Sequence, residues 1–547
     1  MKTLPLILPQ PTQLTLTDGE WVRRHRGRDS SGLRLRISAA PTEYLAAQAA
    51  LLAGYLEEEN HFAAEIVPVA ADGDIHLALT LSPRLLPTKL REAGFSDETY
   101  RLTVTPERIL IEAASPDGIS RGIQTLRQLL SGQRAQFAVP GMIVNDTPEL
   151  GWRGLHLDVS RHFRDATDVK RFIDLAAFHK FNLLHWHLTD DQGWRLPVDG
   201  YPLLTEIAAW RDGTLVGHND DRSKPATDGV RHGGAYTAEE IREVVAYAAA
   251  RGVRILPEVD VPGHVQALVT AYPEFGNTDS VPGVRTRWGI SSSTLNLELV
   301  TFVFLEKVVA TLVELFPFHY LHFGGDEALP DEWIASPRIQ AHKRELGLAT
   351  EHEVQGYFTA RLHELTRARG RAMIGWDEII EHDRPPPDTA VMLWRDSTRN
   401  DLQLDLKALC AGNPLVLANH AHTYFDAYQA AGPGLDFEPL AIGGNLPLEK
   451  VYAWRPLADY PAELHDGLLG AQAQLWTEYI PTRRHLDYMT YPRACALAQV
   501  LWTGEGREDV DAFTRRLATH MPRLDRLGVA YRPTAPEGSL KSCFIKK

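Results

Sequence analysis

From residue 152 onward, short and almost uninterrupted apolar runs alternate with longer segments whose apolar residues recur every three or four positions. Such runs predict strands buried on both faces, and the longer segments predict the helices that cover them. The predicted strands are residues 153–157, 182–187, 253–259, 320–323, 372–376, 390–394, 415–419 and 469–476. Strands that alternate with helices form a parallel sheet, and eight of them predict a (β/α)8 barrel, also called a TIM barrel.

The segments between the predicted strands carry further signals. Residues 168–180, 237–251, 300–316 and 352–369 have the helical pattern. Thr237 and Glu240 begin the second of these with a capping-box sequence. Three consecutive prolines at 385–387 interrupt the short linker between the fifth and sixth strands, so we expect the fifth barrel helix to be missing. Residues 210–234, rich in Gly and Asp, are expected to form a long loop over the mouth of the barrel.

The region before the barrel has a mixed pattern. Residues 99–104 and 108–113 flank a turn at 106–107 and predict a β-hairpin, and residues 118–130 predict a helix. We therefore expect a small non-catalytic α+β domain over residues 1–147 and a catalytic barrel over 148–505. A helix near 511–527 and a tail are expected to make up residues 506–547.

Composition limits the partners and the compartment. The 547 residues include 71 acidic and 57 basic side chains, a net charge of −14, which argues against nucleic acid or an anionic membrane as the main partner. Cys410, Cys495 and Cys543 are few and far apart, which gives neither a disulfide framework nor the spacing of a zinc site. No apolar stretch has the length of a signal-peptide core or a membrane span. We expect a cytoplasmic protein, provided that no signal segment has been removed.

Barrel enzymes place their catalytic groups where strands end. The fourth strand ends in Gly324 and Gly325, and Asp326 and Glu327 follow directly. Alone, this acid pair fits a helix cap as well as an active site. The other strand ends favour an active site, because acids, histidines, an arginine and aromatic residues together suit a sugar. These further candidates are Arg161, Asp190, Asp260, His264, Trp376, Trp394, Tyr424, Asp426, Trp476 and Glu478.

A pair of histidines leaves one alternative open. His185 and His187 lie on the same face of the second strand, as in zinc-dependent barrel amidohydrolases, and His264 and Asp326 would supply further ligands. The competing interpretation is that both histidines are buried and orient their neighbours through hydrogen bonds.

The motifs at the strand ends resemble those of glycoside hydrolase family 20, the β-N-acetylhexosaminidases. The resemblance rests on RGLHLDVSRHF at 153–163, HWHLTDD at 185–191, PEVDVPGH at 257–264, HFGGDE at 322–327, GW at 375–376, LW at 393–394, TYFD at 423–426 and LWTE at 475–478. It covers the whole barrel in the family's order, and the front domain and the missing fifth helix are also family traits. The resemblance implies an exo-acting retaining enzyme that removes terminal N-acetylglucosamine or N-acetylgalactosamine without a cofactor or a metal ion.

The adjacency of the two acids bears on the mechanism. An ordinary retaining glycosidase places two carboxyl groups about 5 to 5.5 Å apart on opposite sides of the cleaved bond, which neighbours in the chain cannot easily do. Family 20 is a known exception, in which the 2-acetamido oxygen of the substrate is the nucleophile. On this hypothesis Glu327 is the general acid and then the base, and Asp326 orients the acetamido group and stabilises the oxazolinium ion.

The resemblance assigns roles to the other candidates. Asp190 and His264 would form a relay toward Glu327, and Asp260 would support Asp326 or His264. Asp191, the neighbour of Asp190, is expected to point elsewhere. Arg161 would hold two hydroxyl groups of the sugar, and Trp376, Trp394 and Trp476 would form the walls of the pocket. Tyr424 would contact the acetamido group. Asp426 and Glu478 would contact the outer hydroxyl groups. A sugar-binding protein that has lost turnover is the alternative from another class. The preferred sugar, the leaving group and the oligomeric state stay open.

Overall fold

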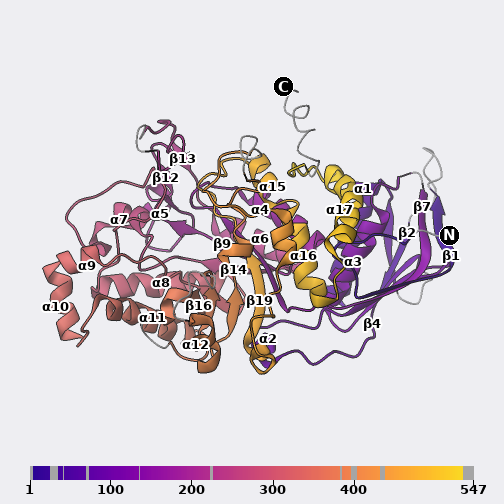
Figure 1. The fold of residues 1–547 in the computed structure, drawn as a ribbon, viewed down its shortest axis with the longest axis horizontal. Coiled ribbons are helices and arrows are strands. Elements are labelled where there is room, and N and C mark those ends of the chain that lie inside the picture. Colours follow the sequence, from indigo (N-terminus) through magenta and orange to yellow (C-terminus); the bar gives the residue numbers. More distant parts are fainter. Residues whose placement is uncertain are drawn as a thin grey trace.

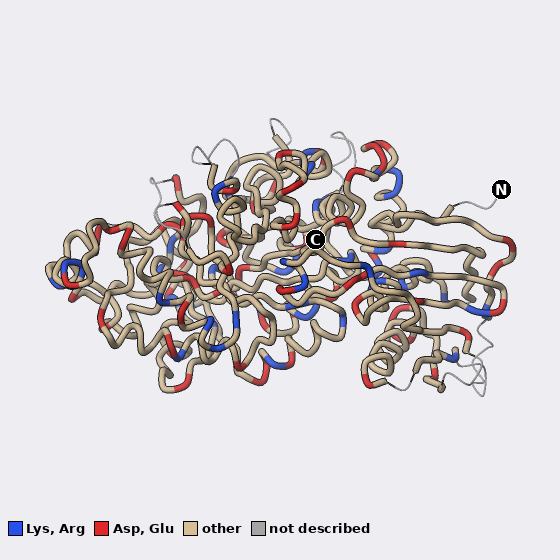
Figure 2. Tube along the Cα trace, turned by 90° about the horizontal axis from the view of Figure 1, so that it is seen from below, with Lys and Arg blue, Asp and Glu red and all other residues tan. Residues whose placement is uncertain are grey.

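The computed structural model describes residues 4–24, 35–40, 42–68, 73–134, 136–221, 226–381, 385–395, 403–431 and 438–533. A mostly β N-terminal domain lies beside a barrel, and α16 (Arg493–Thr503) and α17 (Val510–Arg526) lie where the two meet (Figure 1). Acidic and basic residues are interspersed along the described trace (Figure 2). None of the helices in these ranges combines the length and the apolar composition that a bilayer span requires.

The N-terminal domain is a mixed sheet on which α1 (Glu43–Asn60) and α3 (Pro116–Leu130) pack. Its strands are β1 (Gln13–Arg24), β2 (Leu35–Ala39), β3 (Ala64–Pro68), β4 (Ile75–Leu79), β5 (Tyr100–Val104), β6 (Ile109–Ala113) and β7 (Gln136–Asp146). Within the described residues their order is β1-β7-β5-β6-β4-β2-β3, and β5 and β6 form the predicted antiparallel hairpin. Ser115 caps α3 and Pro116 occupies its first turn, which explains where the predicted helix begins. The small α+β domain is confirmed.

Parallel strands close the barrel in chain order, as predicted. In the described part of the chain the eight strands are β8 (Trp152–Asp158), β9 (Leu183–His187), β14 (Arg254–Glu258), β15 (Tyr320–His322), β16 (Ala372–Trp376), β17 (Ala390–Leu393), β18 (Leu415–Leu417) and β19 (Leu468–Ala473). Nearly all their residues are buried, which is why their sequences lack a polar alternation. The last strand ends at Ala473 and not at 476, because Gln474 and Leu475 leave the ladder and bond to Thr423 and His156.

Helices surround the barrel as predicted. The main ones are α4 (Ala166–Phe178), α6 (Ala238–Ala249), α8 (Leu299–Leu315), α11 (Glu351–Arg367), α12 (Leu404–Ala411) and α16. Thr237 and Glu240 form the capping box at α6. Between β16 and β17 the structure describes residues 377–381 and 385–389, and the only helical element among them is the 3-10 turn η2 (Asp377–Ile380). The predicted absence of the fifth barrel helix is therefore confirmed for these residues.

The connections are short elements and loops. They include α2 (Thr88–Glu92), β10 (Thr189–Asp190), β11 (Gly193–Trp194), α5 (Leu203–Glu206), α7 (Gln266–Ala271), η1 (Pro273–Phe275), α9 (Asp331–Ala335), α10 (Pro337–Glu345), α13 (His420–Thr423), α14 (Leu448–Ala453), η4 (Ala462–Gly467), α15 (Arg483–Thr490) and η5 (Gly504–Gly506). In the predicted loop 210–234, β12 (Trp210–Arg211) pairs with β13 (His232–Gly233), and residues 222–225 are not described. The predicted C-terminal helix is α17, whereas the tail from residue 534 lies outside the described ranges.

Buried contacts join the two domains. Glu98 of the N-terminal domain accepts hydrogen bonds from Arg121 of α3 and from Arg153 of β8, and all three side chains are almost fully buried. Phe95 packs against Trp152 at the N-terminal end of the barrel, with ring centroids 5.8 Å apart. The opposite, C-terminal end of the barrel therefore stays open for a site.

Candidate active site

A cavity of about 740 Å³ opens at the C-terminal ends of the barrel strands, a size typical of small-molecule sites. Most of the predicted site residues line it. They are Arg161, His264, Asp326, Glu327, Trp376, Trp394, Tyr424, Asp426, Trp476 and Glu478. Asp190 and Asp260 do not line it; they are buried among the residues beneath. Asp260 is therefore placed as a support and not as a direct sugar contact.

The turn after β15 delivers the acid pair to the cavity. Gly324 has a φ of +58°, and a Cβ at this position would lie 1.6 Å from Oδ1 of Asp260, so no other residue fits. Glu327 also has a left-handed backbone, with a φ of +47°, which costs a non-glycine residue about 1 to 2 kcal/mol. α9 begins only at Asp331, so Asp326 and Glu327 do not cap a helix. The helix-cap interpretation is wrong, and the strained turn serves to present two carboxyl groups.

His264 lies against both acids. Its Nε2 is 3.6 Å from Oδ2 of Asp326 and 3.5 Å from Oε2 of Glu327, and its Nδ1 is 3.2 Å from Oδ1 of Asp190. Burial alone would lower the pKa of His264, but Asp190 and Asp260 outweigh it and hold that pKa well above its usual value. A charged imidazole thus connects Asp190 to Glu327, the order expected of the relay.

Asp191 corrects one prediction. Its Oδ2 lies 3.7 Å from Nδ1 of His264, and its Oδ1 accepts a hydrogen bond from the backbone N–H of Gln266. The expectation that Asp191 points away from Asp190 is wrong, because Asp190 is the last residue of β10 and Asp191 begins the tight turn to β11. The alternation of side chains that holds along a strand does not apply there.

The surroundings of Asp326 change its acidity. Burial is the largest cause that raises its pKa; His264 opposes it, Glu378 and Glu327 add to it, and the net result is a pKa of about 7. Below about pH 7 the carboxyl group is protonated and cannot stabilise a positive charge.

The acid limb of the pH profile should therefore report Asp326. We expect kcat/KM of the wild type to fall below about pH 7, and the acid limb of His264→Gln to lie at higher pH, because the cation that lowers the pKa of Asp326 is lost. Profiles measured with a nitrophenyl N-acetyl-β-glucosaminide test this. His465→Gln, on η4, is the control and should keep the wild-type profile. An acid limb that stays in place or moves down in His264→Gln would contradict the assignment.

Aromatic side chains form the walls. The rings of Trp376 and Trp476 are 5.9 Å apart, and those of Trp394 and Tyr424 are 6.3 Å apart. Nε1 of Trp376 donates to Oε1 of the buried Glu258 at 2.9 Å, which fixes that indole. Flat apolar faces held in this way suit the faces of a sugar ring.

Polar groups line the other side. Nη2 of Arg161 lies 2.6 Å from Oδ2 of Asp190, and its Nε donates to Gln192, so the guanidinium group is held in one position. Burial and the neighbouring Glu478 raise the pKa of Asp426 to about 8. Oδ1 of Asp426 and Oε2 of Glu478 have no hydrogen-bond partner among the described residues. Unpaired buried oxygens are costly, which favours a ligand rich in hydroxyl groups.

Glu378 was not predicted. Both of its carboxylate oxygens accept from Nε1 of Trp394, at 3.2 and 3.0 Å, and it is among the groups that raise the pKa of Asp326. The sequence feature that could have indicated Glu378 is the pair of acidic residues directly after Trp376, at the end of the fifth strand. Trp288 and Tyr479 also line the cavity without having been predicted.

Family models match both domains. The model described as "Glycosyl hydrolase family 20, catalytic domain" matches residues 150–505, and "Glycosyl hydrolase family 20, domain 2" matches residues 4–147. The chain belongs to glycosyl hydrolase family 20. Its barrel is the family's catalytic domain and its front domain is the family's domain 2.

Named relatives within family 20 are similar over most of this chain. A "Beta-hexosaminidase" of Porphyromonas gingivalis is 36% identical over 81% of this chain, but the match spans only 55% of that protein. A "Beta-hexosaminidase" of Vibrio furnissii is 33% identical over 90% of this chain and 76% of that protein. The crystal structure of a GH20 exo β-N-acetylglucosaminidase from Vibrio harveyi, in complex with N-acetylglucosamine, has a TM-score of 0.81 and 30% identity over 96% of this chain and 78% of that chain. Streptomyces plicatus N-acetyl-β-hexosaminidase, in complex with Thio-NAglucal, has a TM-score of 0.80 and 28% identity over 97% and 98% of the two chains.

The two histidines behind the amidohydrolase alternative lie beneath the family 20 site. Nδ1 of His187 contacts Glu258 at 2.5 Å and its Nε2 contacts Asp190 at 2.9 Å. Nε2 of His185 lies 3.0 Å from Oε2 of Glu258. Both rings therefore face carboxylates in the buried layer, where they orient Glu258 and Asp190, and the family membership sets the amidohydrolase alternative aside.

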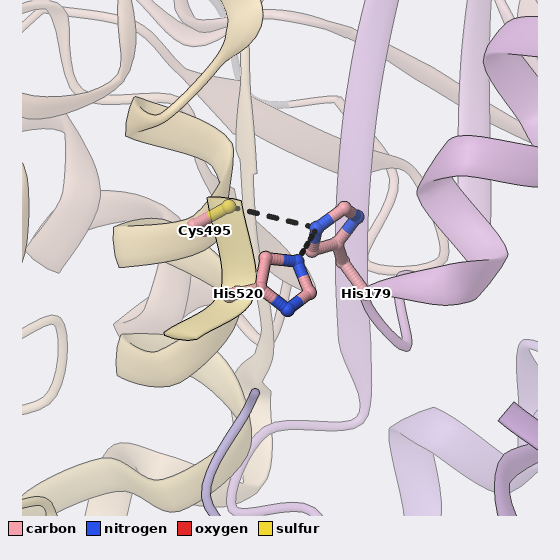
Figure 3. A group of neighbouring side chains, drawn as sticks. All are labelled: His179, Cys495 and His520. Carbon is pink, nitrogen blue, oxygen red and sulfur yellow. Dashed lines mark hydrogen bonds between the residues drawn. The ribbon is translucent and has the colours of Figure 1, made fainter. Parts of the chain in front are cut away.

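A second group of metal-ligand type lies elsewhere, between α4 and the helices α16 and α17 (Figure 3). Nε2 of His179 is 2.9 Å from Nε2 of His520 and 3.5 Å from Sγ of Cys495. Nδ1 of His179 bonds to the carbonyl of Leu175, and Arg523 approaches Nδ1 of His520 at 3.4 Å. Burial lowers the pKa of both histidines, so both are neutral. One choice of tautomers satisfies every contact in this group, so hydrogen bonding accounts for it.

Proposed function

We propose that this family 20 chain is an exo-acting retaining β-N-acetylhexosaminidase. It would remove terminal N-acetylglucosamine or N-acetylgalactosamine through an oxazolinium intermediate. The observation that carries the proposal is that Asp326 and Glu327 approach the same atom, Nε2 of His264, at 3.6 and 3.5 Å. Both acids thus occupy one wall, which leaves the nucleophile to the substrate. The names of the relatives and the aromatic pocket support the same activity.

In the first step Glu327 gives its proton to the glycosidic oxygen, and the bond from that oxygen to the anomeric carbon breaks. The carbonyl oxygen of the 2-acetamido group attacks the same carbon from the other face and closes the oxazolinium ring. Asp326, ionised, accepts the acetamido N–H and stabilises the developing charge. His264 and Asp190 hold Glu327 in place.

In the second step Glu327, now a carboxylate, takes a proton from water. The water oxygen attacks the anomeric carbon, the oxazolinium bond breaks, and the acetamido group is restored. Two inversions give net retention. Arg161 would hold the hydroxyl groups of the ring and Tyr424 the acetamido oxygen, while Asp426 and Glu478 would contact the outer hydroxyls.

A panel of nitrophenyl glycosides tests the activity. We expect rapid release of nitrophenol from N-acetyl-β-glucosaminide or N-acetyl-β-galactosaminide, and a kcat/KM lower by about 10⁴-fold for the β-glucoside that lacks the acetamido group. The two N-acetyl substrates also reveal which sugar is preferred. Equal rates with and without the acetamido group would contradict the proposal.

The same panel separates an enzyme from a sugar-binding protein. Tight binding of N-acetylglucosamine without release of nitrophenol from any substrate would favour the binding protein. We further propose a cytoplasmic location, which rests on the composition and hydropathy of the sequence.

A further inference from the structure

A cavity of about 390 Å³ lies where the two domains meet, at the opposite end of the barrel from the candidate active site. Residues 92–94 and Asp117 of the N-terminal domain form one side of it. The other side includes residues 252–255 at the start of β14, residues 317–319 before β15, and Arg371 before β16. The cavity therefore lies at the N-terminal ends of three barrel strands whose C-terminal ends lead to the catalytic groups.

Arg371 brings a positive charge to this cavity. Among the described residues no acidic side chain forms an ion pair with Arg371, and its buried Nε has no hydrogen-bond partner. His319 lines the same cavity. Burial and the charge of Arg371 lower the pKa of His319, so its imidazole is neutral at pH 7. A guanidinium group without an acidic partner, together with an imidazole that can donate a hydrogen bond, suits a carboxylate or phosphate group.

The other charged side chains of the cavity have partners. Nη2 of Arg254 donates to Oδ2 of Asp117 at 2.9 Å. The side chain of Glu92 is 58% exposed, and its Oε2 lies 3.7 Å from Nζ of Lys89. Within the described part of the chain, the charge that a ligand in this cavity would neutralise is therefore that of Arg371, so the ligand should carry a negative charge.

Apolar side chains form another part of the wall. Val245, Ala249 and Pro317 line the cavity and are at least partly exposed. Phe318 also lines it, and the ring of Phe318 packs edge-on against that of Phe95, with centroids 5.9 Å apart. A ligand with an apolar body beside its anionic group would remove apolar surface from water here.

We propose that this cavity between the domains binds a small molecule with a carboxylate or phosphate group and an apolar body, and that Arg371 and His319 hold the anionic group. Because both domains contribute residues to the cavity, the ligand would contact both and stabilise their packing. The proposal does not depend on the glycosidase activity, since the two cavities share no described residue.

Calorimetric titration of the full chain with phenyl phosphate, and separately with benzoate, tests the proposal. We expect saturable binding that N-acetylglucosamine, added to fill the catalytic site, does not prevent. The tighter of the two probes shows which anionic group the cavity prefers. Inorganic phosphate should bind more weakly than phenyl phosphate, because it makes no apolar contact.

Arg371→Gln should weaken the binding by about 10 to 100-fold, the usual worth of a hydrogen bond to a charged group. Arg367→Gln is the matched control, because Arg367 is an exposed arginine at the end of α11 that does not line the cavity. It should bind both probes as the wild type does. Both variants should hydrolyse substrates at the wild-type rate.

The imidazole of His319 gives an independent signal. Burial and Arg371 lower its pKa, whereas Glu92 and Asp388 raise it. An anion bound to Arg371 favours the charged imidazole, so saturation with phenyl phosphate should raise the pKa of His319. NMR titration of the histidine ring signals measures this shift, with His319→Gln to assign the signal. The shift should be absent in Arg371→Gln.

The lack of saturable binding with both probes would overturn the proposal, and so would equal affinities of the wild type and Arg371→Gln. Binding that N-acetylglucosamine prevents would place the anion in the catalytic site and would also overturn it. Equal affinities for phenyl phosphate and inorganic phosphate would contradict the apolar part of the ligand. The nitrophenyl glycosides test the proposed function separately, so its failure is distinguishable from each of these results.

Discussion

Replacement of Glu327 by Gln is expected to lower kcat by about 10² to 10⁴-fold on substrates with poor leaving groups, such as disaccharides. The amide keeps the shape of the side chain but has no proton to give to the glycosidic oxygen. The loss should be smaller for nitrophenyl glycosides, because nitrophenolate leaves without protonation. Comparison of kcat on the two kinds of substrate measures the contribution of the acid separately from that of the base.

Glu345→Gln, an exposed acid at the end of α10, is a matched control for the same substitution and should behave as the wild type. Turnover of a disaccharide by Glu327→Gln near the wild-type rate would show that another group is the acid. A defect of equal size on every leaving group would also contradict this role.

Asp326→Ala is the second large effect. We expect kcat to fall by about 10² to 10³-fold, the usual cost of removing one group that stabilises charge in the transition state. A thiazoline that mimics the oxazolinium intermediate should lose its tight binding, because its affinity depends on the same carboxylate. Inhibition constants for the thiazoline, measured beside those for N-acetylglucosamine, separate this effect from a general loss of sugar binding.

Asp199→Ala changes an exposed acid away from the cavity and is the control for this variant. Unchanged inhibition by the thiazoline in Asp326→Ala would exclude the acetamido role. In that case the raised pKa of Asp326 would have to serve another purpose.

The strands and the main helices could be predicted because their chemistry is local. A strand buried on both faces has no polar positions, and a helix with one buried face repeats its apolar residues, so both patterns are visible without the fold. The prolines at 385–387 predicted the missing helix for an equally local reason. The acid pair was visible because Gly324, Gly325, Asp326 and Glu327 are consecutive.

Contacts between distant segments could not be read from the sequence. Whether Asp191 shares the imidazole of His264 depends on the turn between β10 and β11. Glu378 accepts a hydrogen bond from Trp394 and raises the pKa of Asp326, and Cys495 contacts His179, which lies 316 positions earlier in the chain. Asp260 was expected to take part in the site, but nothing in the sequence indicated that it lies beneath the cavity and holds the backbone N–H of Gly325.

The central claim is that the substrate supplies the nucleophile. It is tested most directly by kcat/KM for 4-nitrophenyl N-acyl-β-glucosaminides whose acetyl methyl group carries none, one, two or three fluorine atoms. Each fluorine withdraws electrons from the amide oxygen and weakens it as a nucleophile, so we predict a steep fall in kcat/KM along the series. A kcat/KM that does not change with the number of fluorine atoms would contradict the account, because the nucleophile would then have to be a group of the enzyme.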